Sequence, residues 1–151
     1  MMRKSLLLFC SILLITCFSC QEQRSQNNLE NTALSFSKAF YNLDYPEAKE
    51  WATPSSLSYL SFLASNVQQM HLDELKAQGI AEVAILTSQT EEGSLEATVI
   101  CEIKNVLKIN PINGNTEKVT SLLDTLQLTK EDGKWLVRKG IPQQSEKQNR
   151  D

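Results

Sequence analysis

Residues 76–86, KAQGIAEVAIL, contain the point at which the hydrophobic pattern of the chain changes its period. Up to Gly79 the apolar residues recur every three or four positions, which is the spacing of one face of an amphipathic helix. From Ala81 they recur at every second position, through Val83 and Ile85, as in a β-strand. The sequence therefore predicts an α+β domain, in which N-terminal helices pack on a curved antiparallel sheet of about four strands.

Signals for helix ends divide the helical part into three. The apolar stripe of the first predicted helix consists of Leu29, Ala33, Phe36, Phe40 and Leu43. Asp44, with a glutamate three residues later, is typical of a capping box and predicts a short second helix. Thr53, followed by a proline, predicts the start of a third helix. We expect that helix to continue, with a further turn or two, until Gly79 ends it.

Strand periodicity continues from Gly79 almost to the end of the chain. The later strands are expected at residues 95–107, at about residues 119–129 and at residues 134–139. Short connections at residues 91–94, 111–115 and 131–133 imply that neighbouring strands pair antiparallel. Trp135 and Val137 share one face of the last strand, so we expect Trp135 to lie in the core.

The start of the chain is typical of an export signal. Residues 6–18 are apolar apart from Ser11 and Thr16, which is shorter than the roughly 20 residues that a bilayer-crossing helix needs. Ser19 and Cys20 are followed by polar residues, and this arrangement resembles a bacterial lipoprotein signal. In such signals the chain is cut before the cysteine, which carries the lipid. The alternatives are a cut before Cys17, an ordinary cleaved signal peptide and an uncleaved anchor.

The expected organisation has four parts: a signal peptide at residues 1–19, a polar tether at 20–28, the α+β domain at 29–141 and a flexible tail at 142–151. Cleavage and lipidation would leave Cys101 as the only thiol of the mature chain, so we expect no disulfide. The net charge is −3 and no basic stripe is present, which argues against binding to nucleic acid. The expected contact with a membrane is therefore the lipid on Cys20.

Two segments carry a resemblance to a known family. They are KAFYNLDYPEAKEWATPSSLSYLSFL at residues 38–63 and KEDGKWLV at residues 130–137. Both resemble small bacterial lipoproteins of unknown function that have a nuclear transport factor 2-like, cystatin-like fold. The matching positions are Asp44, Tyr45, Ala48 and Thr53 in the helical part and Asp132, Gly133 and Trp135 in the final hairpin. These are caps, turns and core positions, so the resemblance implies a fold and a lipid anchor but no reaction.

The search for catalytic chemistry finds little. His71 is the only histidine, and near the end of the third predicted helix it is expected to have a structural or surface role. Cys101 lies between Val99 and Ile103 on the apolar face of a strand, which is typical of a small buried hydrophobe. The sequence gives no spacing for a metal site and no phosphate-binding glycine loop, so no cofactor is predicted.

Asp124 is a charged residue at a position that alternation assigns to the core. It shares a predicted strand face with Leu122, Leu126 and Leu128. We favour a β-bulge near residue 124 that turns the carboxylate to solvent, because either leucine at 122–123 could face inward. The alternative is an acid on the concave face, with Tyr41, Tyr59 and Trp51 as possible lining residues of a pocket.

Taken together, these features predict a membrane-anchored, non-catalytic module in the bacterial cell envelope. The lipid anchor is expected to lie in a membrane of the envelope, and the outer membrane is favoured. The domain is expected outside the cytoplasm. The module would bind a small apolar ligand or dock another envelope protein. The alternative function is a small isomerase- or dehydratase-like enzyme that uses Asp124 with a tyrosine.

Overall fold

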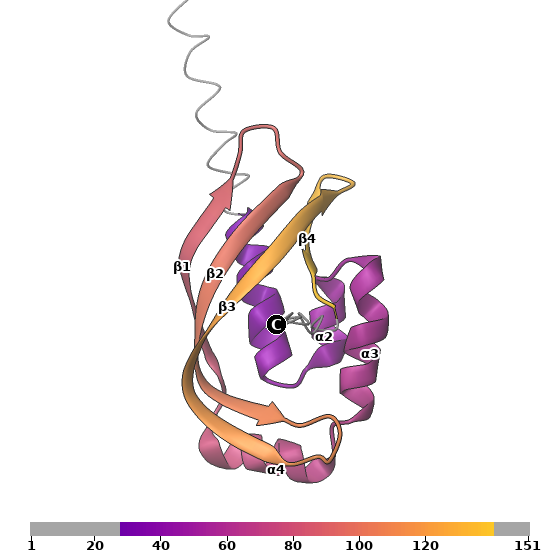
Figure 1. Ribbon diagram of the computed structural model, residues 1–151, viewed down its shortest axis with the longest axis vertical. Coiled ribbons are helices and arrows are strands. Elements are labelled where there is room, and N and C mark those ends of the chain that lie inside the picture. The colour runs from indigo at the N-terminus through magenta and orange to yellow at the C-terminus, as the bar shows by residue number, and fades with distance from the viewer. Residues whose placement is uncertain (1–27, 141–151) are drawn as a thin grey trace, which may run out of the picture.

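The computed structural model describes residues 28–140 (Figure 1). The predicted signal peptide, the lipidation site at Cys20 and the tail from residue 142 lie outside these residues. The N-terminal helix is described over residues 28–41, and the others follow it. They are α2 (Tyr45–Glu50), the 3₁₀ turn η1 (Pro54–Ser56), α3 (Leu57–Ser65) and α4 (Gln69–Gln78). The helices thus precede the strands, as the change of period predicts.

The N-terminal helix and α2 form for the reasons that the sequence indicates. Leu29, Ala33 and Phe36 are buried, so the apolar stripe of the N-terminal helix faces the core. Leu43 takes a positive φ of 61° in the turn that follows. The Asp44 carboxylate then accepts a hydrogen bond from the Glu47 backbone N–H at 3.1 Å, which caps α2.

The prediction of a single third helix that continues to Gly79 is wrong, because the chain forms two helices, α3 and α4, in this range. The break falls at residues 66–68, and α4 starts afresh with a cap in which the Gln68 N–H donates to His71 Nδ1 at 3.0 Å. His71 lies in the first turn of α4, not at the end of a longer helix, and it is fully buried. Its Nε2 lies 3.0 Å from the Gly114 carbonyl oxygen, so the ring joins α4 to the loop after β2. His71 therefore has structural contacts, but it lies at the start of a helix, whereas the sequence predicted a position near the end of one.

Four strands form one antiparallel sheet in the order β1-β2-β3-β4. The strands are β1 (Glu82–Thr90), β2 (Glu96–Ile109), β3 (Thr116–Glu131) and β4 (Lys134–Arg138). The β3–β4 turn has positive φ at Asp132 (47°) and Gly133 (79°), which is the conformation of a two-residue hairpin turn within the connection predicted at residues 131–133. Figure 1 shows the sheet curving around the N-terminal helix, with α2 and α3 on the same side. The predicted α+β architecture is confirmed.

The core lies between the helices and the inner face of the sheet, which is the face that the helices cover. Val99, Cys101 and Ile103 of β2 are fully buried there, and Trp135 and Val137 of β4 are 5% and 0% exposed. The core positions of the last strand are therefore confirmed. Leu95, the first residue of the strand expected at residues 95–107, precedes β2 and is 62% exposed.

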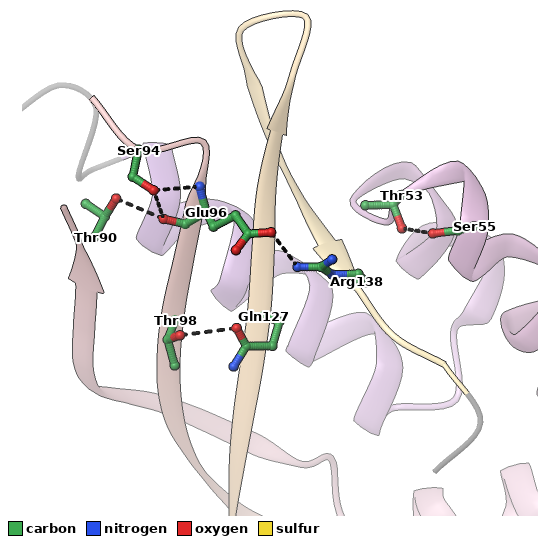
Figure 2. A network of polar contacts seen from close by, with 8 residues as sticks. All are labelled: Thr53, Ser55, Thr90, Ser94, Glu96, Thr98, Gln127 and Arg138. Carbon is green, nitrogen blue, oxygen red and sulfur yellow. Dashed lines mark hydrogen bonds and ion pairs between the residues drawn. The ribbon is translucent and has the colours of Figure 1, made fainter. Parts of the chain in front are cut away.

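The outer face of the sheet carries polar pairs (Figure 2). Thr98 donates to Gln127 across β2 and β3 at 3.2 Å, and Arg138 contacts the Glu96 carboxylate at 3.1 Å. These side chains alternate with the buried ones, as expected for a sheet with one face in water.

Candidate functional site

Asp124 lies on the inner face of β3, opposite Cys101 of β2. The β2–β3 pairing keeps one register on both sides of this position, and no bulge interrupts it. Leu123 points the other way and is 67% exposed. The bulge that was expected to turn Asp124 to solvent is therefore wrong, and the carboxylate faces the helices. The alternation of the strand continues through Asp124 because other residues compensate its charge.

The compensation comes from two residues that are distant in sequence. Tyr41, at the end of the N-terminal helix, donates its hydroxyl to Asp124 Oδ2 at 2.7 Å. Lys139, just past β4, places Nζ 3.0 Å from Oδ1 and 2.8 Å from Oδ2. The ion pair is largely shielded, since the side chains of Lys139 and Asp124 are 22% and 14% exposed. We call Tyr41, Asp124 and Lys139 the concave cluster.

A buried polar network fixes the backbone of Lys139. The Ser56 hydroxyl accepts from the Lys139 N–H at 2.9 Å and donates to the Val137 carbonyl at 3.4 Å. Thr53 Oγ1 lies 2.8 Å from Ser56 Oγ, and both side chains are buried. The Thr53 N–H also donates to the Val137 carbonyl at 2.9 Å. Thr53 was predicted as a helix cap, but its side chain makes no capping bond and instead serves this network.

Aromatic rings surround the concave cluster. Lys139 Nζ lies 5.3 Å from the centroid of the Phe40 ring, which is within the range of a cation–π interaction. Phe40 also packs edge-to-face against Tyr41 at 5.1 Å and Tyr45 at 5.5 Å. Phe40, Tyr41 and Tyr59 are half-buried, whereas Tyr45 is buried. The concave cluster therefore combines one ion pair with several ring faces.

The tyrosines of the site keep their protons well into the alkaline range. Burial raises the pKa of Tyr41 well above its ordinary value, and the Asp124 charge and the hydrogen bond to Asp124 act in the same direction. Burial raises the pKa of Tyr45 to about 12, and Tyr59 adds to this. Burial and then the Asp124 charge raise the pKa of Tyr59. The three phenols are therefore hydrogen-bond donors at neutral pH.

Cys101 lies beside the site but is closed off from it. The residue is fully buried, as predicted, and burial is the main cause that raises the pKa of its thiol. The nearby Ser37 hydroxyl and Lys139 lower that pKa, and Asp124 raises it. Ser37 Oγ approaches the thiol without the geometry of a hydrogen bond, since it has no partner among the described residues. A reactive cysteine needs the opposite, a lowered pKa and exposure.

The structure brings together three of the four predicted lining residues. Asp124 and Tyr41 are bonded, and Tyr59 lies within reach of the Asp124 charge. Trp51 is not part of the group, because its indole N–H is directed to Glu47 on its own helix at 3.0 Å. Sequence reasoning missed Lys139, although it follows Trp135 and Val137 at two-residue spacing and so belongs to the inward side of that strand.

Two further observations concern the described part of the chain. Residues 28–140 contain no cluster of three or more histidine, cysteine or acidic side chains placed to hold a metal ion. In the same range, no helix has the length and apolar character needed to cross a membrane.

Comparison with known proteins gives one informative result. A solved structure, "Putative NTF2-like transpeptidase" from Campylobacter jejuni, matches with a TM-score of 0.51 and 17% sequence identity. The match covers 75% of this chain and 99% of that chain. The fold is NTF2-like. At this identity the likeness extends to the fold alone. No family model and no curated protein matches the sequence of this NTF2-like chain.

Proposed function

We propose that this protein is a lipoprotein of the bacterial cell envelope whose NTF2-like domain binds a small ligand at the concave cluster without catalysing a reaction. The observation that carries the proposal is the inward ion pair of Asp124 and Lys139, which lies among aromatic rings and keeps partial exposure. Ligand sites commonly combine apolar walls with a few fixed polar groups. The sequence also allows docking of another envelope protein, but the concave cluster favours a small ligand.

Binding is favoured over catalysis because the Asp124 carboxylate is already engaged. Oδ1 accepts from Lys139, and Oδ2 accepts from both Lys139 and Tyr41. A general acid or base needs a carboxyl oxygen within reach of the substrate proton, so these bonds would have to break first. In this arrangement Asp124 serves as a fixed charge that orients Tyr41 and Lys139.

The membrane anchor is the second part of the proposal. The apolar segment at residues 6–18, followed by Ser19 and Cys20, supports cleavage before Cys20 and attachment of lipid to its thiol. A single acyl chain gives only marginal membrane binding, so a lipoprotein needs more than one for a stable anchor. The domain would then lie outside the cytoplasm, and we favour the outer membrane as the site of the anchor.

The transpeptidase activity in the name of the Campylobacter jejuni protein is not part of the proposal. Acyl transfer through a covalent intermediate needs an activated nucleophile, commonly a cysteine or serine next to a base. Among residues 28–140 the thiol beside the concave cluster is that of Cys101, which is fully buried and has a raised pKa. The likeness therefore supports a shared scaffold and not a shared reaction.

Native mass spectrometry of the protein extracted from its own envelope tests the ligand-binding proposal. We expect a small molecule to remain bound to the wild-type chain and to be lost from the double variant Asp124→Asn/Lys139→Met, which removes both charges together. Arg138→Met is the matched control, because Arg138 adjoins Lys139 in sequence but lies on the outer face. The same molecule bound equally by all three proteins would contradict the proposed site.

An isomerase- or dehydratase-like enzyme is the second candidate, and the Tyr41–Asp124 hydrogen bond of 2.7 Å favours it. Both kinds of enzyme remove a proton from carbon. In deuterium oxide an isomerase would return deuterium to its product, whereas a dehydratase would give a product that is lighter by one water molecule. Incubation of envelope extracts with wild-type protein and with Asp124→Asn, followed by mass spectrometry, distinguishes the two candidates. The binding proposal expects neither deuterium incorporation nor loss of water that depends on Asp124.

A further inference from the structure

The concave cluster has no net charge. Among the described residues, the charged groups that act on Tyr41, Tyr59 and Cys101 are Asp124 and Lys139, which neutralise each other across 2.8 Å. A charged ligand would therefore lose its hydration without gaining an unpaired partner of opposite sign. An uncharged ligand does not pay this cost.

Neither charge is free to turn towards a ligand. Lys139 is fixed at its backbone by Ser56, at its ammonium group by Asp124 and against the Phe40 ring. Asp124 is held in turn by Tyr41 from the N-terminal helix. The Phe40 face that could hold a cationic ligand already lies against Lys139. A ligand therefore meets two charges that are held in place and neutralise each other.

The remaining hydrogen-bonding capacity includes three donors. The hydroxyls of Tyr45 and Tyr59 make no hydrogen bond to any residue between 28 and 140. An ammonium group has three N–H bonds, and Lys139 directs its bonds to the two oxygens of Asp124, which leaves one N–H available. Groups of this kind bind an oxygen acceptor such as a carbonyl or a hydroxyl.

We infer that the ligand of the concave cluster is an uncharged molecule that presents an oxygen acceptor to Tyr45, Tyr59 and Lys139 and packs an apolar, ring-like part against the surrounding aromatic side chains. The inference rests on the proposed function, since it names the class of ligand for the same site. Anionic and cationic ligands of the same shape are excluded by the cost of desolvating a charge beside a closed ion pair.

Three small probes of nearly the same shape test the inference: benzamide, benzoate and benzamidinium, with charges of zero, minus one and plus one at pH 7. Each is titrated into protein labelled with ¹³C in its tyrosine rings, and signals are assigned with Tyr→Phe variants. We expect benzamide to shift the Tyr45 and Tyr59 signals with a dissociation constant at least about tenfold below those of the charged probes. Tyr59→Phe should weaken the binding of benzamide, whereas Leu123→Ala on the outer face should leave this binding unchanged.

Charge variants make the test sharper. Asp124→Asn leaves the Lys139 charge uncompensated, so this variant should bind benzoate in preference to the other probes. Lys139→Met leaves the Asp124 charge uncompensated, so it should favour benzamidinium. Wild-type protein that binds either charged probe as tightly as benzamide overturns the inference but leaves the ligand site in place. If none of the three probes shifts a tyrosine signal at millimolar concentration, the ligand-binding proposal fails together with the inference.

Discussion

Lys139 and Asp124 form an ion pair in which one ammonium group bridges both carboxylate oxygens, at 3.0 and 2.8 Å. The pair joins the end of the described chain to β3 and lies beside the N-terminal helix through Tyr41. With exposures of 22% and 14%, the two side chains are only weakly screened by water. Their interaction is therefore the feature of the site that mutation can measure most directly.

The first prediction is that breaking this pair from one side is costly. Asp124→Asn should lower the free energy of unfolding by about 1–3 kcal/mol, because it leaves the Lys139 charge partly buried without its partner. Lys139→Met should act similarly. The double variant should cost less than the sum of the two, since it removes both charges. Urea denaturation of the four proteins gives the coupling energy.

The outer-face pair of Arg138 and Glu96 is the control for this cycle. Its side chains are 51% and 69% exposed, so the same cycle there should give a coupling energy of about 0.5 kcal/mol or less. Strictly additive losses at Asp124 and Lys139 would contradict the interaction that the geometry predicts.

The second prediction concerns the lipid anchor. Cys20→Ala should accumulate as an uncleaved precursor that incorporates no labelled fatty acid, because the thiol that carries the lipid is gone. Cys17→Ala should be processed and acylated normally. Pulse labelling with radioactive palmitate, followed by electrophoresis, reads both effects. Normal acylation of Cys20→Ala together with loss of acylation in Cys17→Ala would move the anchor to Cys17.

The third prediction tests the core of the sheet. Trp135 is 5% exposed, and Lys130 Nζ lies 5.6 Å from the centroid of its ring. Trp135→Ala should lower the free energy of unfolding by about 3–5 kcal/mol, because it leaves a large cavity under β4. Leu123→Ala, at a residue that is 67% exposed, should change it by about 0.5 kcal/mol or less. A loss that small for Trp135→Ala would show that the ring is not part of the core.

The fold could be predicted because its signals are local. The change of period at Gly79, the cap at Asp44 and the Asp132–Gly133 turn each depend on neighbouring residues, and the structure contains all three. The break before α4 was missed because Leu63, Val67 and Met70 continue the helical spacing across it. Met70 is 62% exposed, so this spacing did not mark a buried stripe. The cap formed by His71 was not a recognised sequence pattern.

The site could be predicted only in part because its contacts are long-range. Alternation placed Asp124 inward, and the prediction then discarded that position because an unpaired carboxylate in a core is costly. The compensating phenol of Tyr41 lies 83 residues away in sequence. Lys139 shares the alternation of Trp135 and Val137, but nothing local links it to Asp124. Pairing across the sheet therefore had to come from the structure.

The last prediction concerns pH. Burial raises the pKa of Tyr45 to about 12, and burial and Asp124 raise the pKa of Tyr41 well above its ordinary value. In the unfolded chain a tyrosine titrates near about 10, so between about pH 10 and 12 the unfolded chain releases protons that the folded protein keeps. The unfolded state then binds fewer protons, and stability falls as the pH rises through this range. The contribution of Tyr45 is on the order of 3 kcal/mol, complete below about pH 10 and lost by about pH 12.

Two variants separate the tyrosines in that experiment. Tyr45→Phe should flatten the fall in stability, measured by urea denaturation at several pH values, because a phenylalanine has no proton to release. Asp124→Asn should lower the pKa of Tyr41 and of Tyr59, because the Asp124 charge raises both. It should not change the pKa of Tyr45, which is raised by burial and by Tyr59. Phenolate absorbance at 295 nm follows these ionisations. Three tyrosines that all titrate near about pH 10 in the wild-type protein would contradict both the burial of Tyr45 and the contact of Tyr41 with Asp124.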